Sequence, residues 1–310
     1  MLSREFLIER GYCCGLGCRM CPYEPKHIKG NTKMKNEFNS KSIYPSDTIL
    51  YDIIGDDTTI YEPLFARFPN SKSTKHYQDN PIEYKFNNNG FRTPDDFNSE
   101  DEGNIFLGCS HTLGQSHHLE NTWSYKLSKE IGGKFWNLSQ GGGGIQTDFR
   151  LLYHYIKELK VNNVFHYYCC RSRFEYITKD GLIQLNPWSI HEKEEYQGLF
   201  YTDILSDDNS VYLHHLAYFN AIQGLLEKFG VNYYLITKGL FGENDNNYKR
   251  RETRNDGTLT ARDGIDGTNG HYTVGMQDKI YKEFYNKFKR KDYTTISDNI
   301  DINLTGGLHA

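Results

Sequence analysis

The stretch Ile105-Phe-Leu-Gly-Cys-Ser-His-Thr112 decides the fold that the sequence predicts. Its apolar beginning indicates a short buried strand that ends at Gly108, and a helical pattern begins near Asn121. Ser110 then falls at the tip of the tight turn between strand and helix. A turn of this kind lifts a serine out of a sheet and exposes its hydroxyl for attack. The stretch therefore predicts a sheet that carries a nucleophilic serine at its edge.

Strand and helix patterns alternate along the chain from Gly103 onward. Buried strands are expected at residues 105–107, 134–138, 163–170 and 231–236, and helices at 121–131, 148–159, 211–229 and 274–288. Strands separated by helices of this length predict a parallel sheet with helices on both faces. The fold class is therefore α/β. Trp123 and Trp136 are expected in its core.

The chain divides into four predicted parts. Residues 1–35 form a cysteine-rich module, 36–102 a β-rich extension or cap, 103–292 the α/β domain and 293–310 a C-terminal tail. The extension contains short β-like runs, such as residues 48–54, and ends in a turn-rich segment. The histidine pairs at 117–118 and 214–215 are expected at the surface.

Charge and hydropathy exclude several classes of partner. The 310 residues carry a formal net charge of -4, which does not favour binding to nucleic acid or to an anionic membrane. No apolar run approaches the roughly 20 residues that a membrane span needs. Charged residues occupy the N-terminal positions where a secretion signal is apolar. We therefore expect a cytoplasmic protein, or one packaged from a cytoplasm into a virion.

Three segments are expected to meet outside the carboxyl ends of the predicted strands. They are residues 108–110, residues 137–144, which contain four consecutive glycines, and residues 261–275, which precede the last helix. Open parallel sheets place their functional groups at this edge. The three segments together therefore predict one site.

The residues of these segments match the needs of acyl transfer. A serine hydroxyl is a weak nucleophile until a base takes its proton, and His271 is the candidate base for Ser110. Either Asp263 or Asp266 is the acid that orients the imidazole. The backbone N–H groups of Ser110 and Gly142 are the candidate donors to the oxyanion of the tetrahedral intermediate.

In this order and spacing, the three blocks resemble the SGNH (GDSL-like) hydrolase superfamily. The likeness is to a version common in marine phage and bacterial sequences, in which an Asn-Gly-Phe-Arg segment, here residues 89–92, precedes the serine block. The resemblance covers residues 85–290. It implies a three-layer α/β/α sandwich of the SGNH or flavodoxin-like type and cleavage of esters, often acetyl groups on carbohydrates. It also implies Ser110 as nucleophile, Gly142 as oxyanion donor and His271 as base.

The chain departs from this family pattern at three places. Cys109 stands where the family has an aspartate of mainly structural role. The third block lacks the family's oxyanion-binding Asn, and Arg171 or Arg173 is instead the candidate for binding an anionic substrate group. The family's acid lies three residues before its histidine, whereas Asp263 and Asp266 lie eight and five residues before His271.

The N-terminal module has its own candidate chemistry. Cys13, Cys14, Cys18 and Cys21 place four thiols within nine residues, and the surrounding stretch resembles a short cysteine-rich bacterial domain of unknown function. Four thiolates suit zinc, or less readily an iron–sulfur cluster. The alternative is a small reduced or disulfide-stapled knot, because adjacent cysteines do not readily face one ion.

The leading hypothesis is a serine esterase that removes acetyl or other small acyl groups from a carbohydrate and needs no cofactor at that site. The same residues would also serve an O-acyltransferase. A second class of function is a non-catalytic binding protein or virion component with a degenerate SGNH fold. A third is a metal-dependent redox protein built on the N-terminal cysteines.

Overall fold

The structure is a computed structural model, and it describes residues 10, 12–13, 15, 28–30, 42–44, 46–47, 49–51, 82–94, 96–115, 117–168, 173–178, 181–185, 208–237, 252–253, 259–260 and 274–295. Contacts along the chain divide it into two compact units, Met1–Ser40 and Lys41–Ala310. All the described helices and strands lie in the second unit. The described parts of the predicted extension thus belong to the same unit as the predicted α/β domain.

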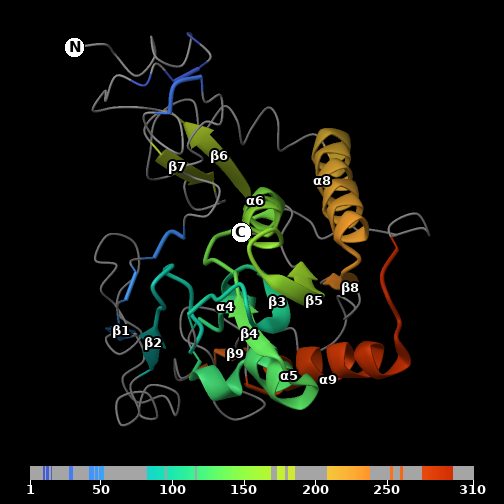
Figure 1. The fold of residues 1–310 in the computed structure, drawn as a ribbon. Coiled ribbons are helices and arrows are strands. Elements are labelled where there is room, and N and C mark those ends of the chain that lie inside the picture. Colours follow the sequence, from blue (N-terminus) through green and yellow to red (C-terminus); the bar gives the residue numbers. More distant parts are fainter. Residues whose placement is uncertain are drawn as a thin grey trace. The chain divides into compact units, whose positions relative to one another are not determined.

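A four-stranded parallel sheet lies at the centre of the second unit, in the described part of the chain (Figure 1). Its strands, in spatial order, are β4 (Lys134–Asn137), β3 (Glu102–Gly108), β5 (Lys160–Tyr168) and β8 (Asn232–Thr237). Counted along the chain, this order is 2-1-3-4, the beginning of a doubly wound order. The prediction of an α/β fold with a parallel sheet is therefore confirmed.

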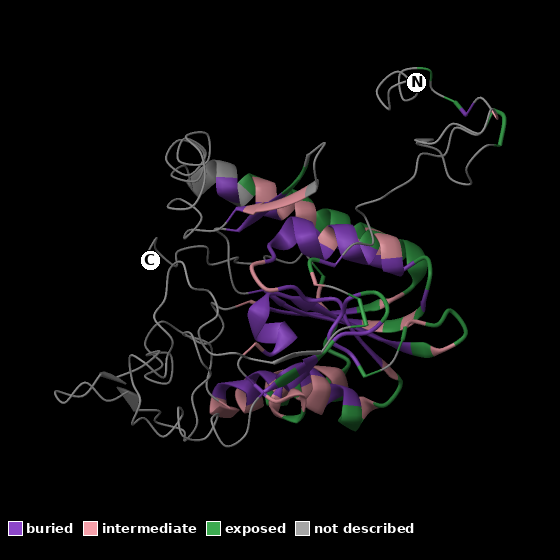
Figure 2. Ribbon diagram, turned by 90° about the vertical axis from the view of Figure 1, so that its left-hand side faces the viewer, coloured by how far each residue is buried: buried purple, intermediate pink, exposed green. Residues whose placement is uncertain are grey.

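Helices cover both faces of the sheet (Figure 1). On one face, α6 (Ile145–Tyr155) and α8 (Asp208–Phe229) pack against the side chains of Ile105 and Leu107. On the other face, α5 (Trp123–Ile131) and α9 (Val274–Arg290) pack against Phe106. Successive strand residues point to opposite faces, so the apolar run of β3 supplies both cores. Figure 2 shows the buried residues gathered in the sheet and on the helix sides that face it.

The described helices begin and end close to their predicted positions. Trp123 and Trp136 are fully buried, as predicted. The helix predicted from residue 148 begins earlier, at Ile145, because the Thr147 hydroxyl accepts the backbone N–H of Gly144 at 3.3 Å and closes the first turn. A short helix, α4 (Ser110–Leu113), and a 3-10 turn, η1 (Leu119–Asn121), were not predicted.

Three antiparallel pairs of strands lie outside the parallel sheet. They are β1 (Ile49–Tyr51) with β2 (Glu83–Lys85), β6 (Phe174–Thr178) with β7 (Gly181–Leu185), and β9 (Glu252–Thr253) with β10 (Leu259–Thr260). The first pair includes part of the β-like run predicted at 48–54. The second pair was not predicted, and it packs Phe174 and Leu185 against Val211 of α8.

Irregular segments cover both edges of the parallel sheet. At the β8 edge, the backbone N–H of Thr294 donates to the carbonyl oxygen of Tyr233 at 2.8 Å. At the β4 edge, the hydroxyl of Thr93 donates to the carbonyl oxygen of Phe135. Unpaired backbone groups of edge strands attract other chains, and each of these contacts satisfies one such group.

Candidate active site

The candidate site lies at the point in the sheet where one strand connection runs over one face and the following connections run over the other. The connection from β3 to β4 runs through α5 on one face, whereas α6 and α8 lie on the other face. Ligands of doubly wound sheets bind outside the carboxyl ends of the strands at such a point. The carboxyl ends of β3 and β5 meet there, with Gly108 paired to Tyr167.

Ser110 lies at this point, two residues beyond β3. Gly108 has a φ of +139°, and a Cβ added to it would lie 2.6 Å from the carbonyl oxygen of Tyr167, so the turn requires glycine. Ser110 is 4 % exposed, and no described residue hydrogen-bonds to its hydroxyl. The structure thus places Ser110 at the centre of the sheet's carboxyl edge. Its hydroxyl has no hydrogen-bond partner among the described residues.

The glycine-rich loop after β4 lies beside the serine turn. The backbone N–H of Leu138 donates to Phe106 O at 3.0 Å, and that of Gln140 donates to Gly108 O at 3.2 Å. The chain therefore continues along β3 beyond the end of β4. Gly142 then turns with a φ of +74°, a conformation that favours glycine. These contacts bring the predicted oxyanion segments, Ser110 and Gly142, to the same edge.

Asn137 connects the end of β4 by a hydrogen bond to the helix that begins at Ser110. Its side-chain amide donates to the carbonyl oxygen of Thr112 at 3.3 Å, and its side-chain oxygen accepts the backbone N–H of Ser139 at 3.2 Å. Asn137 is fully buried. The side chain therefore holds α4 and the start of the glycine-rich loop in one arrangement.

The structure describes one of the two predicted substrate-binding arginines. Arg173 is 9 % exposed and precedes β6, and a Cβ added to Gly144 would lie 2.9 Å from its carbonyl carbon. The backbone of Arg173 therefore packs directly on the glycine-rich loop. Arg171 lies outside the described residues.

A buried polar chain supports the serine turn from the α6 side. The Asp148 carboxylate accepts the backbone N–H of Gly108 at 3.0 Å, and its other oxygen lies 3.1 Å from Nε2 of His166. Nδ1 of His166 lies 2.9 Å from the hydroxyl of Tyr233. All three side chains are buried. Burial, and then the charge of Asp148, raise the pKa of Tyr233 well above its usual value, so the phenol stays protonated.

This chain of contacts was missed by the sequence analysis. Two local signals pointed toward it, a carboxylate in the first turn of a helix and a lone histidine inside an apolar strand. Neither signal identifies the residue that the side chain contacts, because Gly108 and Asp148 are 40 residues apart in the sequence.

A buried ion pair joins α6 to the β6–β7 hairpin. Nε of Arg150 lies 2.6 Å from Oε1 of Glu175, and Nη2 donates to Oε2 at 3.0 Å, so the pair is bidentate. The Thr147 hydroxyl also donates to Oε2 at 3.0 Å. The pair fixes the strand that follows Arg173 against the helix that follows the glycine-rich loop.

The expectation of solvated histidine pairs is wrong for two of the four residues. His117 is 1 % exposed and His215 is fully buried. The ring of His215 contacts Tyr168 and Phe174, and its Nδ1 lies 2.7 Å from the carbonyl oxygen of Val211. Both histidines lie on the side of their helix or turn that packs against the rest of the domain. The local sequence does not specify which side this is.

The upstream Asn-Gly-Phe-Arg segment reaches the far end of α4 through Arg92. This side chain is 1 % exposed and lies over the ring of Tyr84 at 4.2 Å. Its guanidinium donates to the carbonyl oxygens of Leu113, Gly114 and His117 at 3.1, 2.6 and 2.8 Å. Arg92 thereby satisfies carbonyl groups at the C-terminal end of the helix that begins at Ser110.

We expect Arg92→Lys to destabilise the protein by about 2 kcal/mol, because one ammonium cannot reach carbonyl groups that a planar fork spans. Chemical denaturation of the purified protein measures this change. Arg290→Lys is the control, since the Arg290 side chain is 65 % exposed and its replacement is expected to change little. Equal midpoints for the two variants would contradict the role given to Arg92.

The first turn of α9 contacts the neighbour of Ser110. Nε2 of Gln277 donates to the carbonyl oxygen of His111 at 3.2 Å, and Oε1 accepts the backbone N–H of Trp123 at 2.9 Å. The described part of α9 therefore begins next to α4. The predicted base His271 and the alternative acids, Asp263 and Asp266, lie outside the described residues.

Of the four N-terminal cysteines, only Cys13 lies within the described residues. It is 1 % exposed, and its carbonyl oxygen accepts the backbone N–H of Gly30 at 2.8 Å. Cys14, Cys18 and Cys21 fall outside the described part. Within the described residues, no group of three or more His, Cys, Asp or Glu side chains is placed to hold a metal ion.

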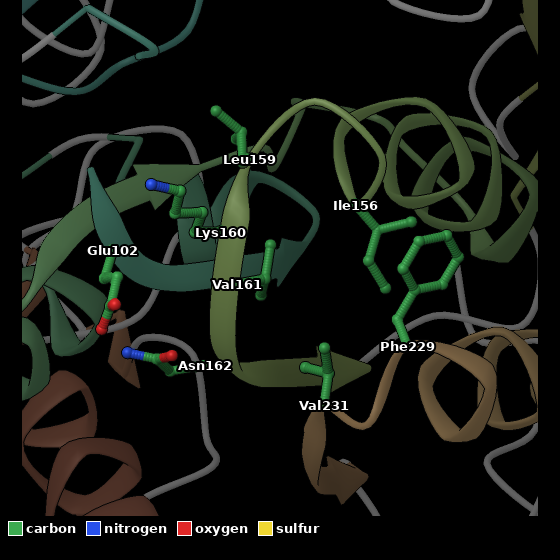
Figure 3. Close-up of a pocket in the computed structure, with 8 residues that line it drawn as sticks. All are labelled: Glu102, Ile156, Leu159, Lys160, Val161, Asn162, Phe229 and Val231. Atoms are coloured by element: carbon green, nitrogen blue, oxygen red, sulfur yellow. The ribbon is translucent and has the colours of Figure 1, made fainter. Parts of the chain in front are cut away.

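A hollow of about 330 Å³ opens at the opposite edge of the sheet (Figure 3). Glu102 and Lys160, the first residues of β3 and β5, line it, so it lies at the amino ends of the strands. The other lining residues are Ile156, Leu159, Val161, Asn162, Phe229 and Val231. Nζ of Lys160 is already paired with Glu100 at 3.2 Å. This hollow is remote from Ser110 and has no part in the candidate site.

Comparisons with known proteins bear on the N-terminal module alone. Residues 2–27 match a family of unknown function, DUF5522. No curated protein matches the chain. No described helix combines the length and the apolar character that a membrane crossing requires.

Proposed function

We propose that this protein is a serine ester hydrolase of the SGNH type, with a three-layer α/β/α sandwich, that removes acetyl or other small acyl groups from a carbohydrate. The observation that carries the proposal is the placement of Ser110. Its hydroxyl has no partner among the described residues and lies at the switch point of a doubly wound sheet. The glycine-rich loop is hydrogen-bonded to the same turn.

In the proposed reaction, Ser110 attacks the ester carbonyl while His271 takes the hydroxyl proton, with Asp263 or Asp266 holding the imidazole. The N–H groups of Ser110 and Gly142 stabilise the oxyanion. The tetrahedral intermediate expels the alcohol, which receives the proton from the imidazolium. Water, activated by the same imidazole, then releases the acid and restores the serine.

The position of α9 supports His271 as the base. Val274 begins α9, whose first turn is bonded to the residue after Ser110. His271 precedes Val274 by three positions in the sequence, so the proposed base belongs to the segment that leads into this helix turn.

The buried Asp148 supports the proposal at a position where the sequence departs from the family. Cys109 replaces the aspartate that usually precedes the serine, and here a carboxylate from α6 accepts the N–H of Gly108. The turn therefore has a charged anchor from another element. Arg173, packed on the glycine-rich loop, is the proposed contact for an anionic group of the substrate.

A separate proposal concerns the N-terminal module. We infer that Cys13, Cys14, Cys18 and Cys21 bind zinc, because four thiolates are a favoured ligand set for that ion. Elemental analysis of the freshly purified full chain tests this, and a zinc content near zero would contradict it.

A fluorophosphonate probe tests the hydrolase proposal. We expect the folded protein to react with the probe, and mass spectrometry of the digested protein to find the label on Ser110, because such probes react with activated serines. Incubation of an acetyl ester with and without a sugar acceptor identifies the acyl acceptor, and free acetate should be the product in both. Absence of label on the folded protein would favour the non-catalytic alternative, and acetylated sugar as the product would favour an acyltransferase.

A further inference from the structure

Tyr44 reaches the glycine-rich loop from a segment distant in the sequence. Its phenolic oxygen accepts the backbone N–H of Gly141 at 3.0 Å, although the two residues are 97 positions apart. A Cβ added to Gly141 would lie 2.7 Å from the same oxygen. The phenol thus both bonds to Gly141 and packs against it, so that the loop has no room to move toward Tyr44.

The ring of Tyr44 is itself held in place. It stacks on Phe86 with ring centres 4.6 Å apart and an angle of 24° between the planes. The hydroxyl of Ser42 accepts the backbone N–H of Tyr44 at 3.1 Å and donates to the carbonyl oxygen of Gly90 at 2.6 Å. Tyr44 is therefore a fixed support rather than a mobile side chain.

The glycine-rich loop needs such a support. Four consecutive glycines lose much conformational freedom on ordering, and an unsupported run of this kind samples many backbone conformations. At its start the loop is held by the bond from Gln140 to Gly108, and Gly143 N–H closes a turn onto Gln140 O at 3.1 Å. Within the described residues, the N–H of Gly141 donates to the hydroxyl of Tyr44.

The phenol keeps this role across the pH range of an assay. Burial raises the pKa of Tyr44 to about 12, although the hydrogen bond from Gly141 opposes the rise. The group therefore remains a neutral acceptor at neutral pH.

We propose that Tyr44 is a positioning residue that holds the Gly141–Gly142 turn, and with it the N–H of Gly142, in the orientation needed to stabilise the oxyanion. The inference deepens the proposed esterase function and rests on it for its catalytic meaning. It gives the predicted 36–102 extension a specific part in the site. Tyr44 acts through the loop and is not assigned a contact with the substrate.

The test compares Tyr44→Phe with Tyr125→Phe in the full chain. Both changes remove one hydroxyl and keep the ring; Tyr125 packs on Phe135 at the α5 side, away from the loop. Hydrogen exchange followed by mass spectrometry is expected to show about fivefold faster exchange in the peptide containing Gly141 for Tyr44→Phe alone. Unchanged exchange there would overturn the proposal.

Kinetics with an acetyl ester provide the second measurement. In Tyr44→Phe, kcat should fall by about 10- to 100-fold while KM stays within about twofold, because a misplaced donor weakens the transition state more than substrate binding. A rise in KM with unchanged kcat would make Tyr44 a substrate contact and overturn the positioning role. A wild-type protein without esterase activity would sink the proposed function, and the exchange measurement would still decide whether Tyr44 holds the loop.

Discussion

Replacing Ser110 by alanine is expected to lower kcat/KM for an acetyl ester by on the order of 10⁴-fold or more, because the variant lacks the nucleophile that forms the acyl-enzyme. The change removes a single oxygen that is bonded to no described residue. The fold should therefore be retained. Initial rates, together with the thermal unfolding midpoint, measure the two effects separately.

Ser128→Ala is the matched control for this experiment. Ser128 and Ser110 are both 4 % exposed, but Ser128 lies on α5 and its hydroxyl donates to Tyr125 O at 2.8 Å. The control variant should keep its activity and lose about 1 kcal/mol of stability with that hydrogen bond. If Ser110→Ala retained a rate within a few-fold of wild type, Ser110 would not be the nucleophile.

Asp148→Ala is expected to destabilise the protein by about 2 to 4 kcal/mol, because a buried hydrogen-bonding group that loses its partner costs about 1 to 3 kcal/mol and two such groups depend on Asp148. The variant would leave the N–H of Gly108 and Nε2 of His166 without their acceptor in the interior. Such a loss is a large part of the free energy of unfolding of a typical domain. Urea denaturation followed by circular dichroism measures it.

Asp278→Ala is the control for the buried carboxylate. Asp278 is likewise a hydrogen-bonded carboxylate, lying 2.5 Å from Nζ of Lys126, but its side chain is 42 % exposed. An exposed pair contributes at most about 1 kcal/mol, so its loss should shift the midpoint little. Similar midpoints for Asp148→Ala and Asp278→Ala would show that the chain from Asp148 to Tyr233 does not stabilise the fold.

The main elements of the α/β fold were predictable because their signals are local. The apolar run before Gly108 and the spacing of apolar residues in α5 and α9 require no knowledge of the rest of the chain. The β6–β7 hairpin was missed because short antiparallel strands depend on cross-strand packing, here against Val211 of α8.

The candidate site was predictable in part. The turn after β3 and the loop after β4 were expected to meet, since carboxyl ends of parallel strands share an edge, and contacts between Gln140 and Gly108 join them. The supporting residues were not predictable. Tyr44 and Asp148 have no sequence motif, and each acts on a glycine that lies far from it along the chain.

The sequence by itself determined the parallel α/β architecture, the serine at the end of a central strand and the glycines that the neighbouring turns require. These features follow from hydrophobic periodicity and from backbone conformations that few residues tolerate. Only the tertiary structure decided which side chains hold those turns: Arg92, Asp148 and Tyr44 each satisfy a backbone group of another segment. Buried polar groups must find partners, but which partner each one finds depends on how distant elements pack.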